Sequence, residues 1–107
     1  MSKKSGFYIC DSKGFHIGFA NGWTVSVQFG PGNYCDNYDQ RIGKDEEKCG
    51  KQGSGTAECA ILNPDRSLVS IPEWGGDTVS NRSTPEDVLR YLQIAAKQSP
   101  EDREVKA

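Results

Sequence analysis

Residues 15–29 read FHIGFANGWTVSVQF, and this stretch decides the fold because it describes two strands joined by a tight turn. Apolar and polar side chains alternate on either side of Ala20-Asn-Gly22, which is the pattern of strands with one buried face. A three-residue loop with Gly22 in the left-handed conformation sets Phe19 opposite Trp23 and keeps the apolar side chains of both strands on one face. A two-residue loop would mix apolar and polar side chains on each face. The stretch therefore predicts an antiparallel hairpin with a three-residue loop.

A third strand is predicted at residues 7–10, which read FYIC and precede the turn sequence Asp11-Ser-Lys-Gly14. If Gly14 takes the left-handed conformation in this loop, Ile9 lies opposite Ile17. The side of this meander that a helix would cover is then predicted to carry Phe7, Ile9, Phe15, Ile17, Phe19, Trp23, Val25 and Val27. On the other face, one row across the three strands is predicted to consist of Cys10, His16 and Ser26.

A second hairpin is predicted at residues 58–62 and 67–71, which flank the turn sequence Asn63-Pro-Asp-Arg66. Pro64 presets the backbone of a type I turn, and both flanking segments are rich in apolar residues. The predicted number of antiparallel strands is therefore about five.

The signal for a helix begins at Thr84, whose side chain can cap the helix, and Pro85 suits the first helical position. Apolar side chains then recur at helical spacing, at Val88, Tyr91, Leu92 and Ala95. The helix is expected to end at Ser99-Pro100. The sequence therefore predicts an α+β protein in which an antiparallel sheet of about five strands, a three-stranded N-terminal meander plus a hairpin, is packed by one C-terminal helix.

The length of 107 residues fits one domain. We expect a single domain over residues 1–98 with a polar loop insert at about 36–56, followed by a flexible charged tail at 99–107. Only 35% of the residues are hydrophobic, so the core is small. Chains with so little apolar surface to bury often gain stability by self-association, which favours a homo-oligomer.

The composition argues against several classes of protein. A net charge of −2 argues against nucleic acid as a partner, because binding to phosphates rests on excess Lys and Arg. No stretch is long and apolar enough for a membrane span or a signal peptide, so we expect no membrane partner and a cytoplasmic location. The four cysteines include no C-x-x-C pair and there is one histidine, so we expect no metal ion and no cofactor.

The predicted row of Cys10, His16 and Ser26 would bring a nucleophile close to a base, which is the minimum equipment of a small hydrolase or transferase. No carboxylate falls in this row to orient the imidazole. We therefore expect the protein not to be an enzyme, and a Cys/Ser-His hydrolase or transferase stays as an alternative.

Two loops, at residues 30–39 and 73–82, combine glycines with aromatic, amide and charged side chains, which is the composition of recognition loops. The side chains predicted to bind a ligand are Asn33, Tyr34, Asp36, Asn37, Tyr38, Trp74, Asp77 and Arg82. A structural role is the alternative for each loop: the first could be packed by its own tyrosines, and Trp74 could cover the core.

Residues 21–37, NGWTVSVQFGPGNYCDN, and 73–88, EWGGDTVSNRSTPEDV, resemble stretches of small uncharacterised accessory proteins of tailed phages. The resemblance implies a class in which some members antagonise host defence, by occluding a host protein or by sequestering a nucleotide signal, in the host cytoplasm. We therefore expect a non-enzymatic binding protein whose partner is a host protein or a small nucleotide-like ligand. A structural or virion component is the further alternative.

Overall fold

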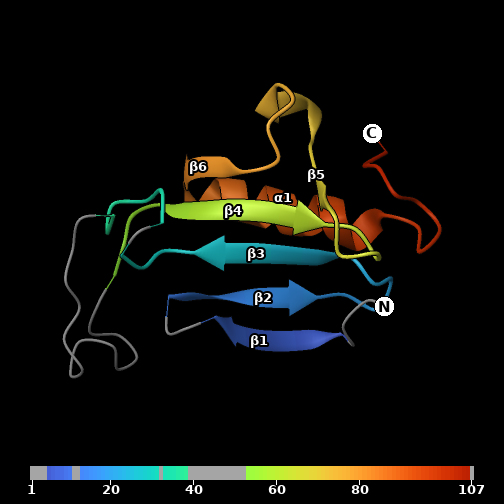
Figure 1. The fold of residues 1–107 in the computed structure, drawn as a ribbon, viewed down its shortest axis with the longest axis horizontal. Helices are drawn as coiled ribbons and strands as arrows, with labels where there is room; N and C mark the ends of the chain where they lie inside the picture. Colours follow the sequence, from blue (N-terminus) through green and yellow to red (C-terminus); the bar gives the residue numbers. More distant parts are fainter. Residues whose placement is uncertain (1–4, 11–12, 32, 39–52, 107) are drawn as a thin grey trace.

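The computed structural model describes residues 5–10, 13–31, 33–38 and 53–106, and the statements below concern these residues. They form one antiparallel sheet with a helix on one of its faces (Figure 1). The elements are β1 (Gly6–Cys10), β2 (Gly14–Gly18), β3 (Thr24–Gln28), β4 (Ala57–Leu62), β5 (Leu68–Val69), the short 3-10 helix η1 (Pro72–Trp74), β6 (Ser80–Ser83) and α1 (Pro85–Lys97). The predicted α+β fold is confirmed, and β6 is a sixth strand that the sequence did not indicate.

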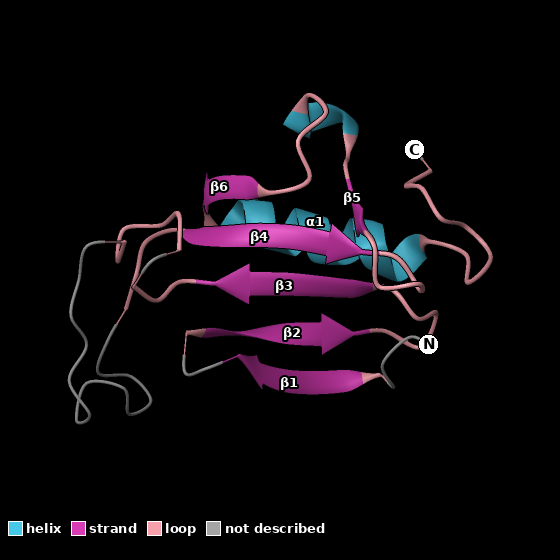
Figure 2. Ribbon diagram, viewed as in Figure 1, coloured by secondary structure: helices cyan, strands magenta, loops and turns pink. Residues whose placement is uncertain are grey.

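The sheet has the order β1-β2-β3-β4-β5, and β6 shares the outer edge of β4 with β5 (Figure 2). β5 pairs with the end of β4, where Ile61 lies opposite Val69. β6 pairs with its beginning, where Ala57 lies opposite Ser83 and an irregularity in the register follows. β5 and β6 therefore pair with different parts of the same edge of β4. The chain that connects them lies outside the sheet and contains η1.

The hairpin of β2 and β3 has the predicted three-residue loop. Gly22 has a φ of 89°, and the N–H of Phe19 donates to the carbonyl oxygen of Trp23 at 2.9 Å. Ile17 lies opposite Val25, as the alternation of apolar residues requires. This part of the prediction is confirmed in both loop type and register.

The register of β1 against β2 differs from the prediction by two residues. Ile9 lies opposite Phe15, and Gly14 is a strand residue that pairs with Cys10 and is not left-handed. The role of Gly14 is close approach, because a Cβ there would lie 2.1 Å from the carbonyl oxygen of Val27. Because side chains alternate with a period of two, a shift of two residues keeps every side chain on its predicted face. Phe7 and Ile9 therefore still lie on the apolar face of the sheet.

The core lies between α1 and the central strands. Its largest buried side chains include Trp23, Val25 and Ile61, and Tyr91 and Ala95 cover them from the helix. The end of α1 is tied to the sheet as well, by the loop before β3 and by the indole of the buried tryptophan. Asn21 Nδ2 donates to the carbonyl oxygens of Ala95 and Gln98 at 2.9 and 2.8 Å. Trp23 Nε1 donates to the carbonyl oxygen of Ser99 at 3.0 Å.

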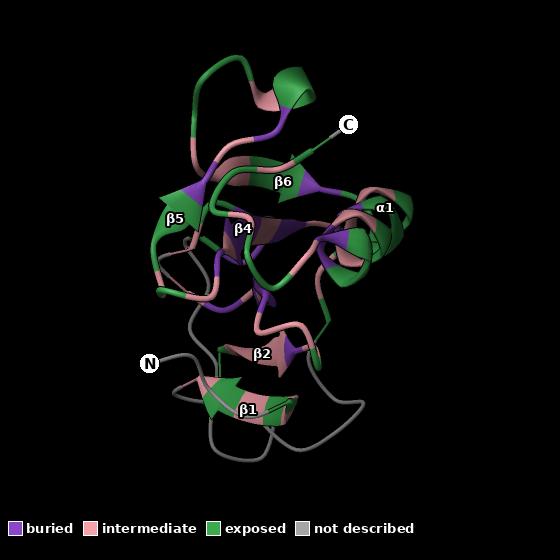
Figure 3. Cartoon of the chain, turned by 90° about the vertical axis from the view of Figure 1, so that its right-hand side faces the viewer, coloured by how far each residue is buried: buried purple, intermediate pink, exposed green. Residues whose placement is uncertain are grey.

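The helix does not cover the whole apolar face. α1 packs mainly on β3, β4 and β6, and β1 lies at the far edge of the sheet (Figures 1 and 3). Phe7 and Ile9 are 82% and 86% exposed, so their predicted place under the helix is wrong. The reason is geometric: one helix of 13 residues spans about 10 Å across, which is roughly two strand spacings.

Residues of the segment at 99–107, for which a flexible tail is predicted, contact the body of the protein. Asn63 Nδ2 donates to the carbonyl oxygen of Arg103 at 3.0 Å, and the Arg103 guanidinium pairs with Asp65 at 2.7 Å. Val105 packs against the core. Residue 107 lies outside the described residues, as does most of the predicted insert at 36–56. None of the helices described here has the length and apolar character to cross a membrane.

Candidate functional site

The two predicted recognition loops meet at one end of the sheet. The backbone N–H of Arg82 donates to the carbonyl oxygen of Tyr34 at 2.9 Å, and Arg82 Nη1 lies 3.2 Å from Asp36 Oδ1. Arg82 belongs to β6, whereas Tyr34 and Asp36 belong to the loop after β3. The fold therefore joins segments that are far apart in the sequence.

Asp36 also holds the segment that leads into β4. Thr56 Oγ1 donates to Asp36 Oδ1 at 2.9 Å, and the N–H of Asp36 donates to Thr56 Oγ1 at 3.0 Å. The ion pair of Asp36 with Arg82 is half exposed, and such pairs contribute only about 0–1 kcal/mol to stability. Its consequence is orientation of the Arg82 guanidinium, which is held beside the loop.

Tyr34 and Tyr38 form an exposed aromatic pair beside these contacts. Their rings are stacked with centroids 5.6 Å apart and an interplanar angle of 6°. The two residues remain 51% and 42% exposed, so about half of this aromatic pair is open to a partner. We call the surface formed by Tyr34, Asp36, Tyr38 and Arg82 the loop-junction surface.

The intervening side chains of this loop point inward. Cys35 and Asn37 are buried, and Asn37 Nδ2 donates to the carbonyl oxygen of Phe29 at 2.8 Å. Asn33 Nδ2 donates to the carbonyl oxygen of Gly30 at 3.3 Å. Of the five residues of this loop that were predicted to bind a ligand, Asn33 and Asn37 thus hold the loop, and the other three present their side chains to solvent.

Two hollows flank the loop-junction surface. One has a volume of about 300 Å³ and is lined by Tyr34, Glu58, Asp77, Thr78, Val79 and Asn81. In the part of the chain that is described, neither Glu58 nor Asp77 takes part in an ion pair. This acidic hollow combines an aromatic ring with two carboxylates, a set that suits a cationic side chain.

The other hollow is mostly apolar and measures about 350 Å³. It lies between the beginning of α1 and the end of β3, where Val27, Phe29, Pro85 and Val88 contribute to its lining. Thr56, which binds Asp36, also lines it. The loop-junction surface therefore adjoins an acidic hollow at Tyr34 and an apolar hollow at Thr56.

Trp74 lies elsewhere and takes the structural role that the sequence left open for it. Its ring packs edge-on against Tyr91, with centroids 5.1 Å apart and an interplanar angle of 78°. Its Nε1 is buried and forms no hydrogen bond with the residues that the structure describes. Of the three residues of the second loop that were predicted to bind a ligand, Asp77 and Arg82 reach the candidate site and Trp74 does not.

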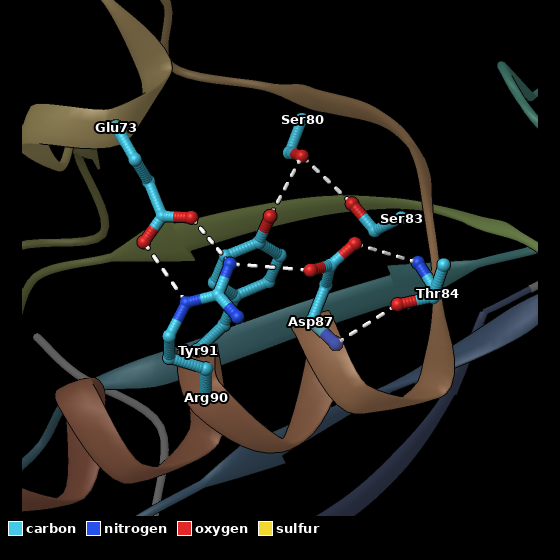
Figure 4. Close-up of polar contacts among 7 residues, drawn as sticks. All are labelled: Glu73, Ser80, Ser83, Thr84, Asp87, Arg90 and Tyr91. Carbon is cyan, nitrogen blue, oxygen red and sulfur yellow. Dashed lines mark hydrogen bonds and ion pairs between the residues drawn. The ribbon is translucent and has the colours of Figure 1, made fainter.

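A network of polar contacts fixes β6 and therefore Arg82 (Figure 4). Arg90 on α1 pairs with Glu73 in η1 and with Asp87 at 3.1 Å. Ser80 in β6 is hydrogen-bonded to the buried hydroxyl of Tyr91 at 3.0 Å and to Ser83 at 2.7 Å. These contacts attach both η1 and β6 to the helix α1.

The beginning of α1 belongs to the same network. Thr84 Oγ1 accepts from the N–H of Asp87 at 3.1 Å, and the Asp87 carboxylate accepts from the N–H of Thr84 at 2.9 Å (Figure 4). The predicted Thr84 cap is confirmed, and the bond from Asp87 makes it a full capping box. The hydrogen bonds from Thr84, together with Arg90, hold the pKa of Asp87 below its ordinary value.

The predicted row of Cys10, His16 and Ser26 does not form. The two-residue shift of β1 places Tyr8 opposite His16, with Ser26 on the other side, and Cys10 pairs with Gly14. Ser26 Oγ accepts a hydrogen bond from Gln28 Nε2 at 3.2 Å. Among the described residues there is no cluster of three His, Cys, Asp or Glu side chains that could hold a metal ion.

The buried cysteine of β4 is also unsuited to nucleophilic chemistry. Cys59 is buried in the core, and burial raises the pKa of its thiol to about 11. The thiolate is the nucleophilic form of cysteine, so this side chain is inert at neutral pH. The described cysteines therefore give the hydrolase alternative no support.

Sequence reasoning missed two contributors to the site. Thr56 follows the Gly53-Ser-Gly55 link and Glu58 lies at the start of a strand, so neither belongs to a motif. Their place follows from the pairing of β4 with β3 and β6, which no local pattern encodes. No protein-family model matches this chain, and neither the comparison with curated proteins nor that with solved structures gives a match.

Proposed function

We propose that this chain is a non-enzymatic binding protein that recognises a protein partner through the loop-junction surface. The observation that carries the proposal is the hydrogen bond between Arg82 and Tyr34, because it assembles exposed tyrosines and an arginine from two separate loops. Tyrosine and arginine are the residues that most often dominate the energy of protein interfaces, together with tryptophan. The stacked ring pair offers a rigid contact area that costs little side-chain entropy.

The charges around this surface favour a partner with a basic side chain. Arg82 is paired with Asp36, so the guanidinium is already neutralised. Among the described residues that line the acidic hollow, Glu58 and Asp77 are then the charged groups. An arginine or lysine of the partner would fit this hollow, with its stem against the Tyr34 ring and its charge near the carboxylates.

The same charges count against a nucleotide as the ligand. A phosphate group needs unpaired cations or free backbone N–H groups, and it would meet Glu58 and Asp77 beside Tyr34. A protein partner can also use the apolar hollow that adjoins the surface at Thr56. We therefore favour occlusion of a protein over sequestration of a nucleotide signal.

This function agrees with the resemblance to accessory proteins of tailed phages, some of which occlude host proteins. We include that setting in the proposal: a phage-encoded antagonist of host defence that acts in the host cytoplasm. A virion component would not require an exposed, charged recognition surface, so we rank it below a binding protein.

Selection from a random displayed peptide library tests the proposed surface without a known partner. We expect the selected peptides to be enriched in Arg or Lys next to an aromatic or aliphatic residue. Their affinity, measured by titration calorimetry, should fall at least about tenfold in Tyr34→Ala and in Asp77→Asn. Glu101→Gln is the matched control, because Glu101 is an exposed carboxylate outside both loops and lines neither of the two hollows.

Two results would contradict the proposal. Selected peptides that bind equally well to the Tyr34 and Asp77 variants would move the recognition surface elsewhere. Retention of a nucleotide in native mass spectrometry, lost in Tyr34→Ala, would replace the protein partner with a nucleotide at the same surface.

A further inference from the structure

Among the strands that the structure describes, β1 is an edge strand of the sheet. Of the strands described, only β2 pairs with it, and it lies farthest from α1 (Figures 1 and 3). Its residues Gly6–Cys10 read GFYIC and contain no charge and no proline. Natural proteins usually place charged residues or proline in an edge strand, because an open edge pairs readily with another chain.

The backbone groups of Phe7 and Ile9 point to the open side of this edge. In antiparallel strands, the N–H and C=O of successive residues point alternately to the two neighbours. The backbone N–H and C=O of Cys10 point toward β2, because its carbonyl oxygen accepts from the N–H of Lys13 in the turn that leads to β2, at 2.8 Å. By the same alternation, the backbone groups of Gly6 and Tyr8 also point toward β2. The backbone groups of Phe7 and Ile9 therefore point away from the sheet.

We propose that two copies of this chain associate by antiparallel pairing of β1 with β1, about a two-fold axis at Tyr8. In this register Phe7 of one copy lies opposite Ile9 of the second copy, and Ile9 lies opposite Phe7. Each of these pairs exchanges both of its N–H···O bonds, since the groups that point outward belong to these residues. The result is one continuous sheet across the dimer.

The strand is complementary to itself in its side chains as well as its backbone. The exposed side chains of Phe7 and Ile9 from both copies would form one cluster on the face that α1 covers farther along. The half-buried Phe15 and Ile17 of β2 lie beside this cluster and extend it within each copy. No charge opposes the pairing, because the strand carries none.

The area of this contact indicates a weak dimer. A buried phenylalanine side chain contributes roughly 150 Å² or more, so the two Phe7 side chains give roughly 300 Å², and the two Ile9 side chains enlarge this area. The two backbone edges and the Tyr8 side chains add to this, and the total stays near the ~1,200 Å² lower limit of specific interfaces. A dissociation constant of about 1–100 µM is therefore expected.

Sedimentation velocity of the full chain over about 5–500 µM measures this equilibrium. We expect a reversible monomer–dimer transition that Ile9→Lys weakens at least about tenfold, because the charge is placed inside the apolar cluster. Leu68→Lys is the matched control, since Leu68 is an exposed aliphatic residue on β5, and it should dimerise as the wild type does. Thermal unfolding must first give a similar midpoint for both variants.

A cross-link tests the register. In the proposed pairing Tyr8 meets Tyr8 of the second copy as a pair without hydrogen bonds, where Cα atoms are about 4.5 Å apart and a disulfide can form. Tyr8→Cys in a Cys10→Ser background should give a covalent dimer on mild oxidation, and Ile9→Cys in the same background should give much less.

Three outcomes would overturn the proposal. The first is a monomer at every concentration, and the second is a dimer that Ile9→Lys leaves unchanged. The third is a complex in which β1 pairs with a strand of a different protein while the chain alone stays monomeric.

Discussion

The backbone N–H of Arg82 is hydrogen-bonded to the carbonyl oxygen of Tyr34 at 2.9 Å, so β6 and the loop after β3 share a bond that neither could form with its sequence neighbours. Arg82 adopts a left-handed conformation with a φ of 51° to make this contact. Glycine adopts that conformation freely and asparagine does so occasionally, whereas other residues adopt it at a steric cost. The position therefore accepts local strain while it brings an arginine to the loop-junction surface.

The strain at Arg82 predicts that Arg82→Gly is more stable than Arg82→Ala. Both changes remove the ion pair with Asp36, so the comparison isolates the backbone. Glycine should give a free energy of unfolding higher by about 1 kcal/mol, because it adopts positive φ without a steric penalty. Urea denaturation of the two variants measures the difference, and equal stabilities would show that the backbone there is not strained.

The tyrosine pair predicts a loss of peptide affinity without a loss of fold. Tyr34→Ala should weaken the binding of selected peptides at least about tenfold, whereas Tyr34→Phe should stay within about threefold, because the stacked ring face is retained. Titration calorimetry gives the affinities, and circular dichroism checks the fold. If Tyr34→Phe is as weak as Tyr34→Ala, the hydroxyl and not the ring makes the contact.

The packing of Trp74 on Tyr91 predicts that Trp74→Ala acts through stability. Because the indole is partly buried in the rim of the core, its removal should lower the free energy of unfolding by about 2 kcal/mol. Peptide affinity of the folded variant should change less than about threefold. Urea denaturation and calorimetry at low temperature separate the two effects. A large loss of affinity in a fully folded Trp74→Ala protein would return this residue to the recognition site.

The capping box predicts a dependence of stability on pH. The pKa of Asp87 is lowered in the folded state, so its contribution is present above the ordinary carboxyl pKa of about 3.9 and is lost as the pH falls through the folded value. Thr84→Ala should lower the free energy of unfolding by about 1 kcal/mol at pH 7. Asp87→Asn should lower it as well, and its difference from the wild type should shrink as the pH falls through the folded pKa of Asp87, because the wild type then loses the charged carboxylate that accepts from the N–H of Thr84. Urea denaturation over a series of pH values below 7 gives the comparison, and a difference independent of pH would contradict it.

The buried thiol of Cys59 predicts selective alkylation. With a pKa of about 11, Cys59 should resist iodoacetamide at pH 8 in the native protein, whereas the half-exposed Cys10 should react. Peptide mapping by mass spectrometry identifies the modified residues, and denatured protein provides the control in which both react. Rapid native labelling of Cys59 would mean that β4 opens readily.

The local signals of this sequence determined the elements and their faces. The Thr84-Pro85 start of α1 and the loop of Gly22 between β2 and β3 were predicted in type and position, because capping and turn geometry depend on a few neighbouring residues. The alternation in β1 fixed the face of Phe7 and Ile9 even though the register was wrong by two residues. The composition of the loops at 30–39 and 73–82 also identified side chains that meet in space.

The tertiary structure alone decided which of those side chains share a site and which apolar residues are covered. The strand β6 and its contact with Tyr34 depend on pairing with β4, between segments too distant for any local pattern to report. Trp74 packs on Tyr91 because burial of an apolar ring against the core lowers the free energy of the folded state more than exposure of the ring to solvent does. Phe7 and Ile9 stayed exposed because the width of one helix, and not the hydrophobicity of the strand, sets how much of a sheet is covered.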